Sequence, residues 1–412
     1  MAKKVSVKRK DNKGRILRTG ESQRADGRYQ FRYKNSLGQT KYLYSSSLPE
    51  LREEEERIEK QKSQGLTGEG DKLTLNEAWS RYMESKRGLR ATTKQNYTQA
   101  YNCYVRNSAL GKMPVGEIKY SVLKDFYSSL IHDKHLKIST IKTLAITLNP
   151  MFETLVRDDI IRANPTKDVM KSIKQENNYS PTKRHSMTID EQEAIIRYMS
   201  ESPVYGRWEN LFVFMLSSGL RVSEVCGLTW SDIDFENGTL SVNRELMKRS
   251  LNGTYGYHVS VPKTKGSVRT IPLLPDTRLA LMRHKKSMDH IKNDFVLDGL
   301  SGFVWLTKDG VPLNHQNVDG VLKRLVDAHN KDEGRNATKE GREPFLVRKI
   351  SAHSLRHTCA TRLCEATDNV AFVAAYLGHS NIQTTLNIYA ECQPDFMQRT
   401  AEEIAEKMSI LA

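Results

Sequence analysis

Two polar segments without hydrophobic periodicity interrupt this chain and do most to limit how it can fold. The first, SQGLTGEGDK at residues 63–72, is rich in glycine and has the composition of a flexible linker. The second, KQENNYSPTKRH, precedes Thr188-x-x-Glu191, a pattern typical of a helix start. A length of 412 residues also exceeds what one hydrophobic core usually organises. We therefore expect a multidomain α+β protein with parts at residues 1–66, 73–175 and 185–395, and a tail at 396–412.

The first part is predicted to be a three-stranded β-sheet followed by one helix. Short runs alternate basic, apolar and aromatic residues in GRILRTGES, RYQFRYK and TKYLYS. Asp26-Gly27 and the segment 35–38 supply turn residues between them. The following segment, PELREEEERIEKQK, is acidic at its start and basic at its end, as the dipole of a helix favours.

The charge of the chain points to a polyanionic partner. The net charge is +15, and residues 1–45 alone hold 13 lysines and arginines against 3 acidic residues. Such a basic segment favours DNA or RNA as the ligand. The residues that combine phosphate donors with stacking rings are the candidate DNA-binding set: Arg24, Arg28, Tyr29, Arg32 and Tyr33. A solvated basic sheet without a ligand is the alternative.

The second part is helical throughout. Apolar residues recur at three- and four-residue intervals in four runs, which predicts a four-helix bundle. The runs are TLNEAWSRYMESKR, TTKQNYTQAYNCYV, YSVLKDFYSSLIHD and STIKTLAITLNPMFETLVRD. Taken alone, this part indicates a generic helical bundle and no function.

Several classes of protein are disfavoured. No stretch approaches the ~18 apolar residues of a membrane span, and MAKKVSVKRK lacks the apolar run of a secretory signal. We expect a cytoplasmic protein without a membrane partner. The five cysteines are scattered, which argues against a disulfide framework. No phosphate-binding glycine loop or cluster of metal-binding carboxylates is visible, so no cofactor or metal is expected.

The third part is predicted to be a mixed α/β domain. Helices are expected through ENLFVFMLSSG and RVSEVCGL, and again from residue 353 onward. Between them we expect GTLSVN and YHVSVP to form a strand pair, with VRTIPLL as a further strand.

Three fragments of this part carry candidate chemistry. Arg221 follows a glycine that ends an apolar helix, and Glu224 is placed to hold its guanidinium; a surface ion pair is the alternative. His353 and Arg356 are three residues apart and project together from a helix. A general acid or base beside a fixed cation is what a reaction at phosphate requires. The third fragment, residues 377–389, supplies a histidine and a tyrosine.

In this order and spacing the fragments resemble the tyrosine recombinase family over residues 188–395. The resemblance implies a catalytic set of Arg221, Lys265, His353, Arg356, His379 and Tyr389. Lys265 lies in PKTKGSVRTIP, which looks like the family's β-hairpin, and Lys263 is a close competitor. Tyr376, in AFVAAYLGH, is interpreted as a core residue. The first part looks like that of conjugative-transposon integrases, which implies an arm-type DNA-binding domain ahead of core-binding and catalytic domains.

The resemblance also implies a mechanism. Arg221 and Arg356 would bind the non-bridging oxygens of a phosphodiester, and Tyr389 would attack it to form a 3′-phosphotyrosine. His353 would act as base, and Lys265 would protonate the leaving oxygen, while the second histidine donates a hydrogen bond to the phosphate. The partners implied are double-stranded DNA at core and arm sites, a homotetramer working through a Holliday junction, and an excision factor.

Two alternatives to insertion and excision of a mobile element remain at this stage. A type IB topoisomerase uses the same phosphotyrosine chemistry but rejoins the original strand. A catalytically inactive DNA-binding or architectural protein could share the fold.

Overall fold

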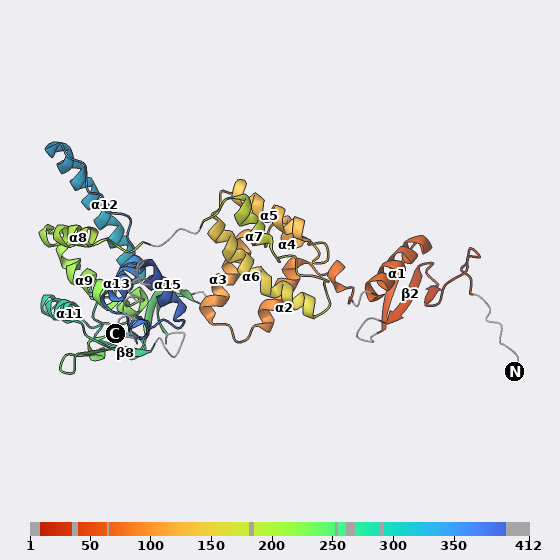
Figure 1. Cartoon of the computed structure of the whole chain (residues 1–412). Coiled ribbons are helices and arrows are strands. Elements are labelled where there is room, and N and C mark those ends of the chain that lie inside the picture. The colour runs from red at the N-terminus through yellow and green to blue at the C-terminus, as the bar shows by residue number, and fades with distance from the viewer. Residues whose placement is uncertain are drawn as a thin grey trace, which may run out of the picture. The chain divides into compact units, whose positions relative to one another are not determined.

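The computed structural model describes residues 9–34, 40–63, 66–180, 185–251, 254–260, 268–288 and 292–392 (Figure 1). The chain forms two units, Met1–Pro181 and Thr182–Ala412. Within the described ranges, the first unit has two separate hydrophobic cores and the second unit has one. The three cores lie within residues 29–51, 73–173 and 187–389. Every helix in these ranges is too short or too polar to span a lipid bilayer.

The first core lies between a small antiparallel sheet and a helix, which confirms the predicted meander. Alternation along the middle strand turns Phe31 toward the helix, where it packs with Leu48 and Leu51. The strand order is β1-β2-β3. The first strand is shorter than GRILRTGES, because residues before Arg18 form a tight turn in which Asp11 accepts backbone hydrogen bonds. The elements are β1 (Glu21–Gln23), β2 (Tyr29–Lys34), β3 (Thr40–Ser45) and α1 (Leu48–Ser63).

Two carboxyl groups are buried together between this sheet and α1. Glu21 on β1 is fully buried and accepts hydrogen bonds of 2.9 and 3.1 Å from Arg52. Glu55 on α1 is also buried, and its Oε1 has no hydrogen-bond partner. Burial, together with the adjacent negative charge of Glu21, raises the pKa of Glu55 to about 7. Glu55 therefore binds a proton at a higher pH than an ordinary glutamate does.

This pair predicts a pH-dependent stability of the small sheet. The pKa of Glu55 is higher in the folded chain than in the unfolded chain, so Glu55 contributes stability that is fully present below about pH 4.5. This contribution is lost as pH rises through about 7. Amide hydrogen exchange in β2 should accordingly be slower at pH 5.5 than at pH 8.5 after correction for the intrinsic rate. Glu55→Gln should remove this dependence and stabilise the sheet at pH 8.5 by about 2 kcal/mol. The exposed neighbour substitution Glu53→Gln is the control; an equal effect there would refute the assignment.

The second core is a helical bundle. The four predicted runs form its longest helices, and Trp79 stacks on Tyr101 with ring centroids 4.3 Å apart. Two short helices were not predicted, α4 and α7, and α7 includes residues that the sequence assigned to the second linker. The helices are α2 (Leu75–Ser85), α3 (Ala91–Tyr104), α4 (Ala109–Lys112), α5 (Tyr120–His132), α6 (Ile138–Arg157) and α7 (Val169–Glu176).

The second unit is mixed α/β as predicted, but the expected strand pairing was wrong. The strand in GTLSVN pairs with Arg269–Pro272, and the strand in YHVSVP pairs with Glu245–Leu251. Two small sheets result, with orders β4-β5-β8 and β6-β7. The strands are β4 (Ile233–Asp234), β5 (Thr239–Val242), β6 (Glu245–Leu251), β7 (Thr254–Ser260) and β8 (Arg269–Pro272).

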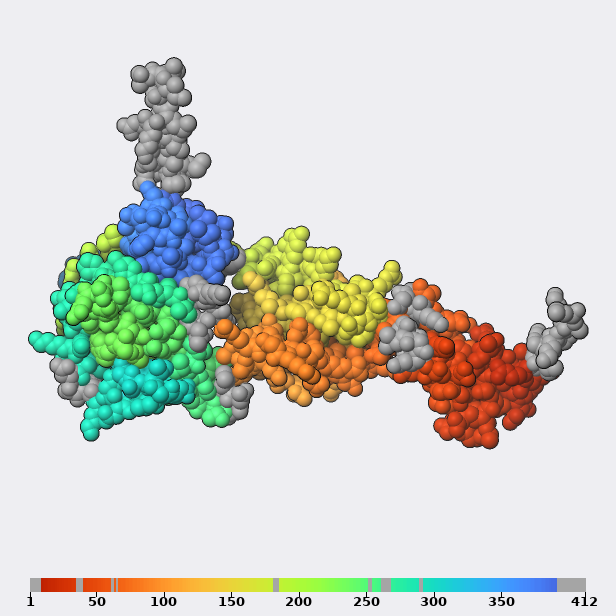
Figure 2. Space-filling model, turned by 90° about the horizontal axis from the view of Figure 1, so that it is seen from below, coloured from red at the N-terminus to blue at the C-terminus, as the bar shows by residue number. Residues whose placement is uncertain are grey.

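Helices make up most of the core of this unit. The central helix α13 packs against α9, α14 and α15. In Figure 2 the last helices, coloured blue, gather into one compact lobe of the unit. The helices are α8 (Ile189–Glu201), α9 (Glu209–Ser218), α10 (Val222–Cys226), α11 (Pro275–Ser287), α12 (His315–Glu340), α13 (Ala352–Ala366), α14 (Val370–Leu377) and α15 (Gln383–Cys392).

Candidate phosphoryl-transfer site and DNA-binding surface

Arg221 is placed by the sharp break between α9 and α10. Gly219 ends α9 with φ +61, and a side chain there would lie 2.6 Å from Leu377 and 2.9 Å from the Cys359 sulfur. The position therefore requires glycine for both conformation and space. Arg221 then becomes the N-cap of α10, and its Nη1 donates to Glu224 at 2.6 Å. The predicted pairing of Arg221 with Glu224 is present, and it is partly buried rather than on the surface.

Glu224 is the buried counter-ion of a second arginine. Its side chain is fully buried, and Arg269 on β8 donates to both of its oxygens at 3.2 Å. Arg269 also donates from Nε to the backbone oxygen of Tyr376 at 2.8 Å. Burial alone would raise the pKa of Glu224, but the charges of Arg269 and Arg221 outweigh it and hold the pKa below its usual value. Sequence reasoning included Arg269 in the segment PKTKGSVRTIP but gave it no role.

Arg356 is buried and is held by two backbone carbonyls. Its Nη1 donates to Gly219 O at 2.8 Å, and its Nη2 donates to Leu377 O at 2.7 Å. Arg221 reaches the neighbouring carbonyl, Gly378 O, at 3.0 Å. Both predicted arginines are thus anchored at the C-terminal end of α14. Burial and the nearby charge of Arg221 lower the pKa of Arg356 to about 10, so it remains a cation at neutral pH.

Among the described residues, the three arginines of this cluster surround one carboxylate, that of Glu224, so two positive charges are left over. A site with excess positive charge and little access to water favours an anion with several oxygens. Guanidinium groups donate in a fixed fork that matches phosphate oxygens. The cluster is therefore a candidate phosphate site.

The predicted histidines border this cluster. His379 follows α14, and its Nδ1 lies 2.8 Å from the hydroxyl oxygen of the fully buried Thr385. Burial, followed by the positive charges of Arg356, Arg221 and other neighbours, lowers the pKa of His379 to about 4. A neutral ring whose Nδ1 accepts from Thr385 carries its proton on Nε2 and can donate it to a phosphate oxygen. His353 is exposed in the first turn of α13.

The two tyrosines considered from the sequence lie in different surroundings. Tyr389 on α15 is only 5% exposed, and its hydroxyl donates a hydrogen bond to Asp368. Tyr376 is in the core as predicted, with its hydroxyl 3.2 Å from Ser217 O, and burial raises its pKa well above the usual value. Sequence reasoning did not find Asp368 or Thr385. Lys265 and its competitor Lys263 lie outside the described residues.

The candidate DNA-binding residues divide between the two faces of the small sheet. Tyr29 is 3% exposed and its hydroxyl donates to Asp11, so its proposed role in stacking on DNA is withdrawn. Tyr33 is half-buried and stacks on Phe31 with centroids 5.7 Å apart. Because side chains alternate along a strand, Arg32 points to the opposite, open face.

The open face carries two exposed tyrosines that sequence reasoning missed. Tyr42 lies opposite Arg32, and the guanidinium of Arg24 lies 5.4 Å from the ring centre of Tyr44. Both tyrosines are about half exposed, at 49% and 48%. The alternation in TKYLYS is the signal that could have identified them. Arg28 is also exposed and pairs with Asp26 at 2.9 Å.

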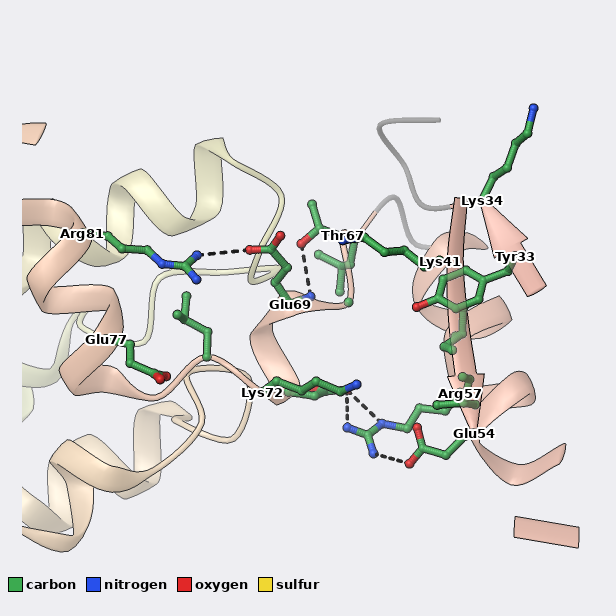
Figure 3. A pocket seen from close by; sticks show the side chains of 16 residues that line it. Tyr33, Lys34, Lys41, Glu54, Arg57, Thr67, Glu69, Lys72, Glu77 and Arg81 are labelled. Atoms are coloured by element: carbon green, nitrogen blue, oxygen red, sulfur yellow. Dashed lines mark hydrogen bonds and ion pairs between the residues drawn. The ribbon is translucent and has the colours of Figure 1, made fainter. Parts of the chain in front are cut away.

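Basic and acidic side chains together line a separate pocket in the first unit. It has a volume of about 390 Å³ and lies around the segment 66–73 (Figure 3). Its arginines are already paired with acidic side chains that line the same pocket. Arg57 pairs with Glu54 and Asp71, and Arg81 pairs with Glu69 at 3.3 Å.

Comparison with known proteins agrees with this geometry. Residues 185–395 match the phage integrase family, and residues 5–62 match the DNA binding domain of tn916 integrase. These matches and the fold define a tyrosine-type site-specific DNA recombinase. The chain belongs to the phage integrase family, and within it to the integrases of the conjugative-transposon type.

Individual relatives support this placement. The transposase from transposon Tn916 of Enterococcus faecalis is 29% identical over 406 residues, covering 95% of this chain and 95% of that protein. A structure of the Tn1549 transposon integrase in complex with a circular intermediate DNA has a TM-score of 0.70 and 28% identity; it covers 79% of this chain and 99% of that chain. A lambda integrase tetramer bound to a Holliday junction shares the fold, with a TM-score of 0.52 and 18% identity over 90% of this chain and 94% of that chain.

Proposed function

We propose that this recombinase cuts and rejoins DNA through Tyr389, inserting and excising a mobile element. The observation that supports this most directly is the anchoring of Arg221 and Arg356 to adjacent carbonyls at the end of α14. Two guanidinium groups fixed side by side can bind the non-bridging oxygens of one phosphodiester and stabilise the charge that develops as it is attacked.

The remaining roles follow from what the reaction requires. The hydroxyl of Tyr389 must lose a proton as it attacks phosphorus, and we assign His353 as the base. The neutral His379 donates a hydrogen bond to the phosphate. The departing 5′ oxygen must gain a proton, which we assign to Lys265. The 3′-phosphotyrosine conserves the energy of the broken bond, so rejoining requires neither nucleotide nor metal.

The stoichiometry of strand exchange sets the proposed assembly. Exchanging both strands of two duplexes breaks four phosphodiester bonds, and each break consumes one nucleophilic tyrosine. A chain with one such tyrosine therefore acts as a tetramer, through a Holliday junction that resolves after the second pair of exchanges. We further propose that an excision factor sets direction and that the reaction takes place in the cytoplasm on cellular DNA.

A test for covalent chemistry distinguishes this function from its alternatives. Nicked duplexes drawn from the DNA flanking the gene are incubated with the protein in EDTA, and the adduct is detected on a denaturing gel. An inactive DNA-binding protein would form no adduct. A type IB topoisomerase would form one but would relax supercoiled DNA without a preferred sequence, whereas the proposed integrase would join two different duplexes.

The small sheet is proposed to bind arm-site DNA through its open face. Arg32→Ala should weaken binding to an arm-site duplex and reduce the slope of log affinity against log salt by about one, because one phosphate contact is lost. Fluorescence anisotropy at several salt concentrations measures this slope. Lys60→Ala, an equal charge change at an exposed position on α1, is the matched control. An unchanged slope for Arg32→Ala would contradict the assignment of this face.

A further inference from the structure

Helices α13 and α14 form a hairpin with different side chains at its open and closed ends. At the open end, Arg356 near the start of α13 donates to Leu377 O at the end of α14, at 2.7 Å. At the closed end, the short connection between the two helices contains Asp368, which is exposed. The arginine site and Asp368 therefore lie at opposite ends of the hairpin.

The separation can be estimated along each helix. From Arg356 to the end of α13 there are about ten residues, which rise about 15 Å at 1.5 Å per residue. The eight residues of α14 rise about 12 Å. Both paths place Asp368 roughly 10 Å or more from the backbone carbonyls at the end of α14 that anchor the arginines. The side chain of Arg356 does not shorten this distance, because it points to Gly219 O and Leu377 O.

The hydroxyl of Tyr389 is at the closed end. It donates its hydrogen bond to Asp368, and the ring is packed in the hydrophobic core of the unit. A nucleophile attacks from about 3 to 3.5 Å, in line with the leaving group. A phosphate held by Arg221 and Arg356 is beyond that reach, so Tyr389 must leave Asp368 before it can attack.

We infer that Asp368 is a positioning residue that holds Tyr389 in a resting place away from the phosphate site, so that DNA cleavage requires its release. This inference rests on the proposed role of Tyr389 as nucleophile. Its competitor is a direct role, in which Asp368 accepts the proton of Tyr389 during attack. The two readings predict opposite effects of removing the carboxylate.

The test compares Asp368→Ala with Glu365→Ala. Glu365 is exposed in the last turn of α13 and pairs with Arg362, so both variants lose one negative charge in the same region. With saturating nicked DNA and a single turnover, Asp368→Ala should form the adduct on the order of tenfold faster, because a hydrogen bond to an exposed carboxylate is lost. Glu365→Ala should match the wild type. Asp368→Asn, which keeps a neutral acceptor of the same shape, should lie between.

A second measurement does not depend on catalysis. In the DNA-free protein, the nitration of Tyr389 by tetranitromethane is followed by mass spectrometry, with buried Tyr376 and exposed Tyr42 as references. Nitration of Tyr389 should increase in Asp368→Ala and stay at the wild-type level in Glu365→Ala. If nitration of Tyr389 increased in Asp368→Ala but the protein formed no DNA adduct, the role of Asp368 in holding Tyr389 would stand and the proposed function would be wrong. Slower adduct formation by Asp368→Ala, or no change in either measurement, would overturn the inference.

Discussion

Tyr389→Phe should reduce the covalent protein–DNA adduct below detection while DNA affinity stays within about twofold. The substitution removes one oxygen and leaves the ring packed in the core of the second unit. Without the phenol oxygen no phosphotyrosine can form, so the covalent adduct should be lost completely. The measurements are a denaturing gel for the adduct and a gel-shift titration for affinity.

Tyr376→Phe is the matched control for this result. Tyr376 is similarly buried, and its hydroxyl bonds to a backbone carbonyl, so the substitution should cost about 1 kcal/mol of stability and leave the adduct in place. If Tyr389→Phe still formed the adduct and Tyr376→Phe did not, the nucleophile would have been assigned to the wrong residue.

The second large effect is expected for Lys265→Ala. An alkoxide is a poor leaving group because the pKa of its conjugate acid is close to that of water and far above neutrality, whereas the pKa of a thiol is roughly 8.5. Removing the proposed acid should slow cleavage of ordinary DNA by ~10² to 10⁴. DNA with a 5′-bridging sulfur scarcely needs protonation, so most of the loss should be recovered on that substrate. Single-turnover cleavage rates on the two substrates give the ratio.

Two further variants make this test specific. Arg356→Ala should show no recovery with sulfur, because its proposed contacts are to the non-bridging oxygens. Lys263→Ala is the control for the choice of lysine. If the sulfur substrate restored the cleavage rate of Lys263→Ala and not that of Lys265→Ala, the general acid would be Lys263. If it restored neither rate, the proton would come from another group.

The long helices were predictable from sequence, whereas the strand pairing was not. Apolar residues repeat often enough in α2, α3, α5 and α6 for the period to be read locally. The strands of the second unit have two to seven residues, and such short alternating runs do not specify their partners. Their pairing depends on the way the chain crosses from β5 to β8, which is a property of the whole unit.

The same distinction applies to the functional residues. Order and spacing along the chain were enough to single out Arg221, Arg356 and His379, which the structure brings together. Alternation along the strands of the small sheet separates its two faces, but it does not show which face α1 covers. Tyr29 was therefore predicted to contact DNA, although it lies on the covered face. Asp368 could not be found from sequence, because its contact with the tyrosine exists only after α13, α14 and α15 have packed.

The anchoring of Arg221 and Arg356 to main-chain oxygens has a consequence for engineering. A carbonyl is present whichever side chain a residue carries, so a main-chain acceptor such as Leu377 O tolerates sequence drift that would destroy a contact between side chains. The other two acceptors are exceptions, because a side chain would lie 2.6 Å from Leu377 at Gly219 and 2.8 Å from Arg269 at Gly378. Libraries designed to retarget this integrase can therefore randomise the surface of α14 freely, provided that Gly219, Gly378 and Glu224 are kept.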